Sequence, residues 1–365
     1  MKIAEIRTVI EDIAPLKLQE PYDNAGLLTG SNDWNVKGIL ITVDVTEKVI
    51  EEAVKNGDNL IISHHPVIFN SIKSLTGITA TERILIQAIK NDIAIYAAHT
   101  NLDNVFSGVN KKICEKLGLL KCRILDAGKN KLVKLVTFVP EDHVLQVREA
   151  LFSSGAGHIG NYDNCSYNIA GQGTFKGGEG TNPFVGETGK LHIENEIRIE
   201  TVIPREKING CIRAMISAHP YEEVAYDIYP IENEYPQVGS GMTGEFETPV
   251  PHKEFMNLLQ KTFHIPVIRY SGSIKNEYKR VSVCGGSGSF LLGKAIQAHS
   301  DAFLTSDIKY HQFFDADKKL LLCDIGHYES EQFTKEIFYD LLMKKFSTFA
   351  VHLSGIITNP VKYYI

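Results

Sequence analysis

Ile61-Ile62-Ser63-His64-His65-Pro66 ends an apolar stretch with two adjacent imidazoles and a proline. The apolar residues predict a buried β-strand, and successive side chains of a strand point to opposite faces, so the two rings are expected to diverge. Pro66 favours an extended conformation at His65 and separates the rings further. The pair can therefore serve two different centres, whereas two surface histidines at a strand end are the plain alternative.

Two further junctions of the same kind favour a functional site. The segment Ala97-Ala98-His99-Thr100-Asn101-Leu102-Asp103 also follows an apolar strand, and Asp324-Ile325-Gly326-His327-Tyr328-Glu329-Ser330-Glu331 follows another one far downstream. In open α/β sheets, ligands bind at the carboxyl ends of the strands, which is where all three segments fall. We therefore expect the three segments to form one site.

The composition is that of an ordinary globular protein. The chain has 365 residues, 43% of them hydrophobic and 22% charged, so we expect more than one domain and neither a disordered nor a membrane protein. The net charge of -6 disfavours nucleic acid and anionic membranes as partners. Charges at the start of the chain and the absence of a long apolar run argue against a signal peptide or a membrane span, so the cytoplasm is the expected compartment.

The cysteines point to the same compartment. They are scattered, with no C-x-x-C pair, which argues against a zinc knuckle or a disulfide framework and favours buried thiols in a reducing environment. They are Cys114, Cys122, Cys165, Cys211, Cys284 and Cys323.

Strand and helix patterns alternate at both ends of the chain, with short connections between them. This alternation predicts an α/β fold, a mixed or parallel sheet with helices on its faces. The predicted strands are Gly38–Asp44, the stretch that ends at His64, Ile93–Ala98, Arg280–Cys284, Ala302–Leu304 and Leu320–Cys323.

The middle of the chain, residues 128–244, is richer in turns and glycines. Its predicted elements follow the order β-α-β-β-α-β, which indicates a small ferredoxin-like α+β domain. They are 131–140, 143–153, the glycine-rich hairpin region 155–189, 196–204, 205–217 and 223–230. We therefore expect a metal-binding α/β core of residues 1–127 and 245–365, interrupted by an inserted domain of residues 128–244.

Five side chains of the three junctions form a set of nitrogen and oxygen ligands: His64, His65, Asp103, His327 and Glu331. Such a set suits Zn, Mn, Fe, Co or Ni. His327 and Glu331 are four residues apart and lie on one face if a helix begins there. Five ligands exceed the needs of one tetrahedral ion and suit two divalent ions, zinc first, bridged by Glu331 or Asp103. A metal pair lowers the pKa of a bound water and so generates hydroxide, which indicates a hydrolytic function. The alternative is a structural metal site.

Other residues are secondary candidates. His311 lies on a predicted helix and is a candidate catalytic acid or base. His99 is expected to orient a ligand or to bind backbone, and His219 of the inserted domain is not expected to be a ligand. A glycine loop between a strand and a helix resembles half of a nucleotide-binding turn and is a candidate phosphate site. Its glycines are Gly285, Gly286 and Gly288.

Four motifs in order resemble the Nif-three-like family, also called GTP cyclohydrolase I type 2 homologs. They are Asp-Asn-Ala-Gly-Leu at 23–27, Ser-His-His-Pro at 63–66, His-Thr-Asn-Leu-Asp at 99–103 and Gly-His-x-x-x-Glu at 326–331. The resemblance implies a Nif-three-like mixed-sheet core. It also implies a dinuclear metal centre, whose ligands fall on His64, His65, Asp103, His327 and Glu331.

The segment Ala-His-Pro-Tyr-Glu-Glu-Val-Ala-Tyr-Asp at 218–227 is similar to the PII/CutA-like insert of the longer, YqfO-type members. Those relatives form toroidal homohexamers, so the resemblance implies the same assembly. GTP ring opening is attributed to some members, and the expected function is a metal-dependent hydrolase that opens the ring of GTP or a related nucleotide. The alternative is a metal-binding regulatory or scaffold protein whose PII-like domain senses a small molecule. A nucleic-acid-associated ring is disfavoured by the net charge.

Overall fold

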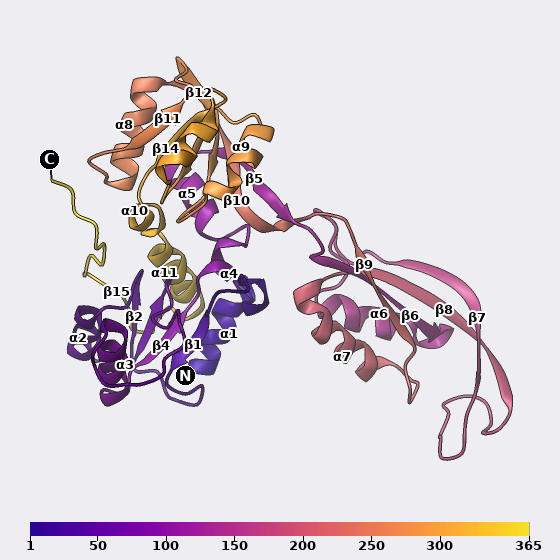
Figure 1. Ribbon diagram of the computed structural model, residues 1–365. Helices are drawn as coiled ribbons and strands as arrows, with labels where there is room; N and C mark the ends of the chain where they lie inside the picture. Colours follow the sequence, from indigo (N-terminus) through magenta and orange to yellow (C-terminus); the bar gives the residue numbers. More distant parts are fainter. Residues whose placement is uncertain (365) are drawn as a thin grey trace. The chain divides into compact units, whose positions relative to one another are not determined.

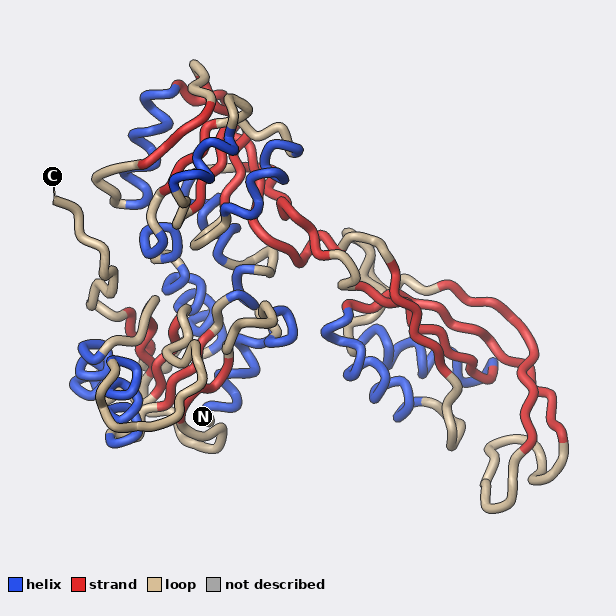
Figure 2. The backbone as a smooth tube through the Cα atoms, in the orientation of Figure 1, coloured by secondary structure: helices blue, strands red, loops and turns tan. Residues whose placement is uncertain are grey.

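The computed structural model describes residues 1–364 and divides into two compact units, shown in Figure 1. The first unit contains Met1–Ala127 together with the chain from Pro236 onward, and the second unit contains Gly128–Tyr235. The first unit contains two β-sheets and the second unit contains one, and the colouring of Figure 2 shows helices packed beside the strands. The α/β class predicted from the sequence is confirmed.

A five-stranded sheet in the first unit has the order β1-β4-β3-β2-β15. Strands β15, β2, β3 and β4 are parallel, and β1 pairs antiparallel with β4 at the edge. Every residue of β2, β3 and β4 is buried, as expected for parallel strands covered on both faces. The strands are β1 Gly26–Thr29, β2 Ile39–Thr42, β3 Leu60–Ser63, β4 Ala94–Ala97 and β15 Val351–Leu353.

Helices α2 and α3 pack on this sheet through one apolar core that includes Leu40, Ile50, Ile61, Ile84 and Ile95. Helix α11, near the end of the chain, contacts α1, β2 and β15, so the C-terminal segment returns to the first sheet. The helices that cover or follow these strands are α1 Ile3–Ile13, α2 Glu47–Asn56, α3 Ala80–Lys90, α4 Thr100–Asp103, α5 Val109–Leu117 and α11 Thr334–Lys345.

A second sheet of the first unit has the order β11-β14-β13-β12-β10-β5. Its central strands β12, β13 and β14 are parallel, whereas β11 and β10 pair antiparallel with β14 and β12. The elements are β5 Leu120–Gly128, β10 Tyr235–Pro251, α8 His252–Phe263, β11 Arg269–Gly272, β12 Glu277–Val283, α9 Leu292–Gln297, β13 Ala302–Thr305, β14 Leu321–Asp324 and α10 His327–Glu331.

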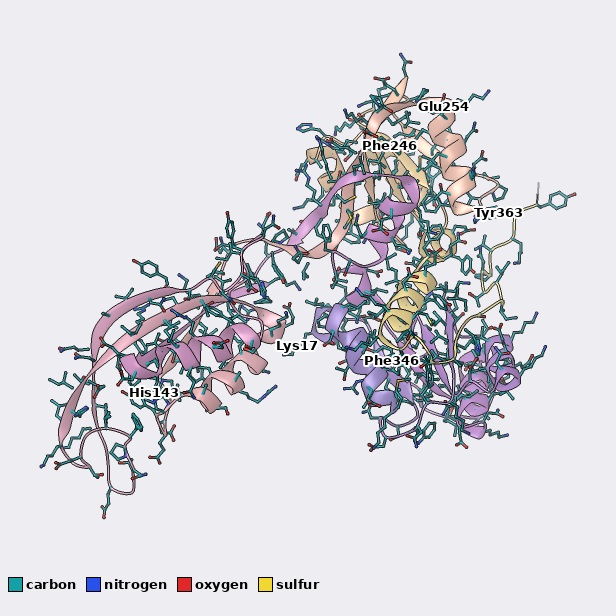
Figure 3. The ribbon with its side chains drawn as sticks, turned by 180° about the vertical axis from the view of Figure 1, so that it is seen from behind. Lys17, His143, Phe246, Glu254, Phe346 and Tyr363 are labelled. Atoms are coloured by element: carbon teal, nitrogen blue, oxygen red, sulfur yellow. The ribbon has the colours of Figure 1, made fainter. Side chains whose placement is uncertain are left out.

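Aromatic packing joins β10 to the helix that follows it. Phe246 of β10 is buried, and its ring centroid lies 6.1 Å from that of Phe255 on α8. Phe255 in turn stacks on Tyr278 of β12, with centroids 4.6 Å apart. Figure 3 shows these elements from behind, with Phe246 and the exposed Glu254 labelled. The contacts place β10 within the core of the first unit.

The second unit is an antiparallel sheet in the order β7-β8-β6-β9, packed on two helices. Its core contains Val133, Leu151, Ile199 and Met215, which come from β6, α6, β8 and α7. The element order β-α-β-β-α-β predicted from the sequence is confirmed, and the strand order is that of a ferredoxin-like sheet. The elements are β6 Leu132–Pro140, α6 Val144–Ser153, β7 Tyr167–Lys176, β8 Leu191–Pro204, α7 Ile208–Ala218 and β9 Tyr226–Ile231.

The border between the units differs from the predicted one at its downstream end. The sequence places the end of the inserted domain at residue 244, whereas Pro236 already belongs to the first unit. The reason is β10, in which Met242 pairs with Val283 and Thr243 with Ser282. The glycines just before the predicted border, such as Gly239 and Gly244, are therefore residues of a strand in the second sheet of the first unit.

Two smaller expectations concern helices and thiols. In the part of the chain that the structure describes, no helix combines the length and the apolar character needed to cross a membrane. All six cysteines are free thiols, and four of them are buried.

Candidate metal centre

His64 and His65 follow β3 and point to one place. Their ring centroids lie 4.9 Å apart, and both backbone N–H groups donate to the carbonyl of Val43. The prediction that the rings diverge to opposite faces is wrong, because β3 ends at Ser63 and the alternation of a strand ends with it. The two rings nevertheless have different further neighbours.

Six side chains form three overlapping groups of three, and within each group the ligand atoms lie within 4.8 Å of one another. His65 groups with His327 and Glu331, and His64 groups with Asp103 and Glu331. The third group joins His64 and His65 to His99. All five predicted ligands thus come together with His99, and we call this set the histidine cluster: His64, His65, His99, Asp103, His327 and Glu331.

Glu331 lies at the middle of the histidine cluster. It is 2% exposed, and its Oε2 lies 2.8 Å from Nε2 of His65 and 3.1 Å from Nε2 of His327. Its Oε1 lies 3.7 Å from Nε2 of His64. His327 and Glu331 are the first and last residues of α10, so the predicted placement one turn apart is confirmed. A carboxylate between three imidazoles is placed to bind a cation together with them.

Three buried polar atoms of the histidine cluster have no hydrogen-bond partner. They are Nε2 of His64, Oδ1 of Asp103 and Oε2 of Glu331, whose short contacts to imidazoles lack hydrogen-bond geometry. Buried polar atoms are normally satisfied, so three unsatisfied ones aimed at the same point indicate a missing partner. A divalent cation would satisfy all three, and this donor set therefore fits a metal.

Carboxylates fix the orientation of two of the imidazoles. Nδ1 of His65 lies 2.7 Å from Oδ1 of Asp44, and Nδ1 of His327 lies 2.6 Å from Oδ2 of Asp307. Each Nδ1–H donates to its carboxylate, and Nε2 is turned toward Glu331. Metal-ligating histidines are typically held in this way. The sequence reasoning missed Asp44, which ends the predicted strand Gly38–Asp44, and Asp307, which lies three residues after the predicted strand Ala302–Leu304.

The other two imidazoles are held in the same manner. Nδ1 of His99 lies 2.8 Å from Oδ1 of Asp23, and Asp23 also accepts from the backbone N–H of Thr100 at 3.0 Å. Nδ1 of His64 donates to the backbone carbonyl of Ala98 at 3.0 Å. The sequence predicts that His99 orients a ligand or binds backbone, whereas its Nδ1 lies on a carboxylate and the ring groups with His64 and His65 as a possible ligand itself.

The carboxylates change the proton affinity of the cluster. Burial disfavours the charged form of His65, but Asp44 and Glu331 outweigh it and raise the pKa of His65 to about 10. Burial likewise opposes the charge on His327, yet Asp307 and Glu331 raise its pKa to about 11. Burial, with the repulsion of Glu331, raises the pKa of Asp103 to about 8. The cluster therefore holds protons that a metal ion would displace.

The glycine loop after β12 does not fit a phosphate cradle. The backbone N–H groups of its three glycines already donate to side chains within the fold. The pairs are Gly285 to Asn110 at 3.0 Å, Gly286 to Ser330 at 3.0 Å and Gly288 to Thr305 at 2.8 Å. Gly286 has φ +63°, and a Cβ there would overlap with Glu331. The loop instead allows the backbone to approach the histidine cluster closely.

His311 lies apart from these groups. It belongs to a 3-10 helix, Tyr310–Ala316, where it is exposed and its ring packs edge-on against Tyr310 at 5.2 Å. Among the described residues, His311 is absent from all three groups of the cluster. No role for His311 at the cluster follows from the structure. His219, as expected, is not a member either, because its ring nitrogens bind backbone in the second unit.

A cavity of about 680 Å³ opens beside the histidine cluster. His65, His327 and Glu331 form part of its wall. Tyr22 and Phe69 line it as well, with ring centroids 6.4 Å apart, and both rings are largely exposed. A cavity of this size accommodates a small organic molecule, and the aromatic pair offers a stacking surface.

Comparison with known proteins gives concordant matches. The family described as Duf34/NIF3 (NGG1p interacting factor 3) matches residues 1–360. A "GTP cyclohydrolase 1 type 2 homolog" of Halalkalibacterium halodurans is 41% identical over 100% of both chains. Its namesake in Bacillus subtilis is 38% identical over 91% of this chain and 89% of its own.

Solved structures agree with the sequence matches. A Bacillus cereus protein related to NIF3 superposes with a TM-score of 0.86 at 36% identity, covering 100% of this chain and 99% of that one. A Staphylococcus aureus protein reaches a TM-score of 0.78 at 29% identity, with coverage of 100% and 99%. The whole length of the chain is thus shared with these relatives.

Proposed function

We propose, since this chain belongs to the Duf34/NIF3 family, that it is a metal-dependent hydrolase acting on GTP or a related nucleotide at the histidine cluster. The observation that carries the proposal is Glu331, a buried carboxylate with an unsatisfied oxygen between the Nε2 atoms of His65 and His327. The name of the relatives, a homolog of a GTP cyclohydrolase, suggests the substrate class.

The ligand set divides naturally between two ions. His65 and His327 would hold one, His64 and Asp103 the other, and Glu331 would bridge them, in line with the two groups that share it. His99 faces the side of His64 and His65 and can complete a coordination shell. When two divalent ions are bound, they supply Lewis acidity and lower the pKa of water toward neutrality.

The chain's own residues orient the metal-binding histidines and offer a stacking surface for the substrate. Asp44 and Asp307 hold Nδ1–H of His65 and His327, which leaves each Nε2 unprotonated for a ligand role once a cation is present. Tyr22 and Phe69 line the mouth of the cavity and would stack on a purine ring. The substrate's base would thereby lie beside the cluster.

The test is metal-dependent turnover by the full chain. We expect GTP or a related purine nucleotide to be consumed by the metal-loaded protein, with activity lost on chelation and restored by Zn, Mn, Fe or Co. His327→Ala should abolish turnover, whereas His311→Ala should leave it unchanged, because His311 is exposed outside the cluster. A loss of about 10²-fold or more in His311→Ala would return that residue to a role in proton transfer. An occupied metal site without turnover of any nucleotide in a broad screen would favour the regulatory or scaffold alternative.

We also propose the toroidal homohexamer implied by the family resemblance. Native mass spectrometry of the full chain checks it, and a monomer or dimer as the dominant species would contradict it.

A further inference from the structure

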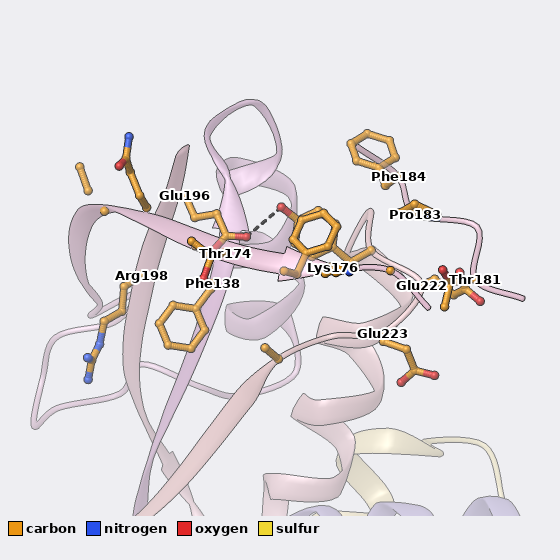
Figure 4. A pocket seen from close by; sticks show the side chains of 18 of the residues that line it. Phe138, Thr174, Lys176, Thr181, Pro183, Phe184, Glu196, Arg198, Glu222 and Glu223 are labelled. Carbon is orange, nitrogen blue, oxygen red and sulfur yellow. Dashed lines mark hydrogen bonds between the residues drawn. The ribbon is translucent and has the colours of Figure 1, made fainter. Parts of the chain in front are cut away.

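A second cavity, of about 570 Å³, lies wholly within the second unit. It is lined by β7, by β8 and by the segment that follows α7, and Figure 4 shows its side chains. Aromatic rings form much of its wall: Phe138, Phe175, Phe184 and Tyr221. The rings of Phe175 and Phe184 lie 6.2 and 6.3 Å from that of Tyr221. We call it the carboxylate cavity, for Glu196.

Glu196 is a buried carboxylate in this aromatic surrounding. It is 8% exposed, and its Oε1 accepts a hydrogen bond from the Tyr221 hydroxyl at 2.8 Å, the dashed line of Figure 4. No Lys, Arg or His nitrogen among residues 1–364 forms an ion pair with it. A buried carboxylate without a cationic partner is costly unless another molecule supplies the charge.

The fold makes room for this carboxylate. Gly173 of β7 pairs with Glu194 of β8 and lies diagonal to Glu196, and a Cβ at Gly173 would collide with Oε2 of Glu196. Any side chain there would push the carboxylate out of its place. Because Gly173 has no side chain, the second oxygen of Glu196 can lie at the cavity wall.

A local network holds Tyr221 in position. The backbone N–H of Tyr221 donates to Nδ1 of His219 at 3.1 Å, and Nε2–H of His219 donates to the Phe138 carbonyl at 3.0 Å. Burial lowers the pKa of His219, so the nearby imidazole is uncharged at neutral pH and does not neutralise Glu196. Both the ring and the hydroxyl of Tyr221 are thus fixed in the wall.

The remaining charges leave the cavity negative. Glu222 and Glu223 line it together with Glu196, and Arg198 at the other end is paired with Glu200 at 2.8 Å. Lys176 is exposed. An anionic ligand would meet this excess of carboxylates, whereas a cation is attracted both by Glu196 and by the faces of the aromatic rings.

We propose that the carboxylate cavity binds a small planar organic cation of the guanidinium or amidinium class. Such a group presents N–H donors in one plane, which matches the two oxygens of a carboxylate. Its flat face stacks on Tyr221, Phe175 or Phe184. This inference concerns the second unit alone and is independent of the function proposed for the histidine cluster.

Isothermal titration calorimetry of the full chain with benzamidine tests the proposal, with neutral benzamide and anionic benzoate as probes of the same shape. We expect benzamidine to bind at least about tenfold more tightly than benzamide, and benzoate not to bind. Glu196→Gln should weaken benzamidine binding at least about tenfold, because the isosteric amide keeps the hydrogen bond to Tyr221 and removes only the charge. Glu149→Gln, on the exposed face of α6 and outside the cavity lining, is the matched control and should change binding less than about twofold.

Two further variants guard against a folding defect in Glu196→Gln. Phe184→Ala removes an exposed ring and should weaken benzamidine binding severalfold. Gly173→Ala should displace Glu196 and abolish benzamidine binding. Circular dichroism checks that each variant is folded. No benzamidine binding to the wild-type chain, equal binding to Glu196→Gln, or a preference for benzoate would each overturn the proposal.

Discussion

Glu331 and Glu196 are two buried carboxylates with opposite surroundings. Glu331, 2% exposed, has imidazole nitrogens on three sides, and two of those imidazoles, His65 and His327, are held by further carboxylates. Glu196, 8% exposed, accepts its one hydrogen bond within residues 1–364 from the Tyr221 phenol, and the rings of Phe175 and Phe184 lie beside that tyrosine. Burial alone therefore says little about a carboxylate's role, and the chemistry of its neighbours decides whether it suits a metal ion or an organic cation.

The largest expected effect tests whether the two sites are independent. Removing residues 129–234 and joining Gly128 to Tyr235 through a short linker should leave a folded, metal-binding first unit, because β5 and β10 are neighbours in one sheet. Removing residues 128–244 should instead give an insoluble chain, since it deletes the part of β10 that pairs with β12. Solubility, circular dichroism and metal content distinguish the two deletions. Equal behaviour of both would contradict the border placed at residue 235.

The next effect concerns Glu331 itself. We expect the wild-type chain to carry about two divalent ions, and Glu331→Gln or Asp103→Ala to lose at least half of them without unfolding. Glu329→Gln is the matched control, since Glu329 is buried in the same helix but binds Asn359 at 2.8 Å. Plasma mass spectrometry of the purified proteins measures the difference. Full metal content in Glu331→Gln would remove that residue from the ligand set.

A smaller effect on metal binding is expected from Asp307, which contacts the candidate ligand His327. Asp307→Asn should keep the shape of the residue but weaken its hold on Nδ1–H of His327, and should lower metal affinity about 10–100-fold. Competition with a coloured chelator gives the dissociation constant without reference to activity. Asp315→Asn, on the exposed surface nearby in sequence, should leave it unchanged. An unaltered constant in Asp307→Asn would show that His327 needs no carboxylate to orient it.

The smallest effect returns to the second unit. Tyr221→Phe removes the one hydroxyl that donates to Glu196, and we expect benzamidine binding to change only about threefold, because the charge and the ring both remain. Metal content should not change at all. A large loss of binding in Tyr221→Phe would mean that the hydroxyl, and not the charge of Glu196, dominates recognition.

Much of the histidine cluster could be predicted because its ligands lie in the segments that follow buried strands. His64 and His65 after β3, Asp103 after β4 and His327 after β14 lie at corresponding edges, and that relation is visible in the order of apolar and polar residues. Asp44 and Asp307 follow the same rule, but no local pattern tells whether a strand-terminal carboxylate faces a metal, a histidine or water. The partner decides, and the partner is distant in sequence.

Three further differences between the sequence pattern and the structure have the same origin, a partner that is distant along the chain. The loop of Gly285 and Gly286 has the appearance of an anion site, yet its N–H groups are used by Asn110 and Ser330, which lie far away along the chain. The predicted border at residue 244 falls within β10, where Gly239 and Gly244 are positions that another backbone or side chain approaches closely. Glu196 lies in a strand that reads as exposed, and only the course of β7 beside it buries the carboxylate.

Gly286 has a consequence for how this protein can vary. Every substitution of a glycine by another amino acid adds a Cβ. At Gly286 the new residue would have to adopt φ +63°, and its Cβ would overlap with the carboxylate of Glu331. No substitution at this position is therefore conservative. In a deep mutational scan that selects for bound metal, we expect the codon of Gly286 to be as intolerant as those of the histidines, although glycine itself offers no ligand atom.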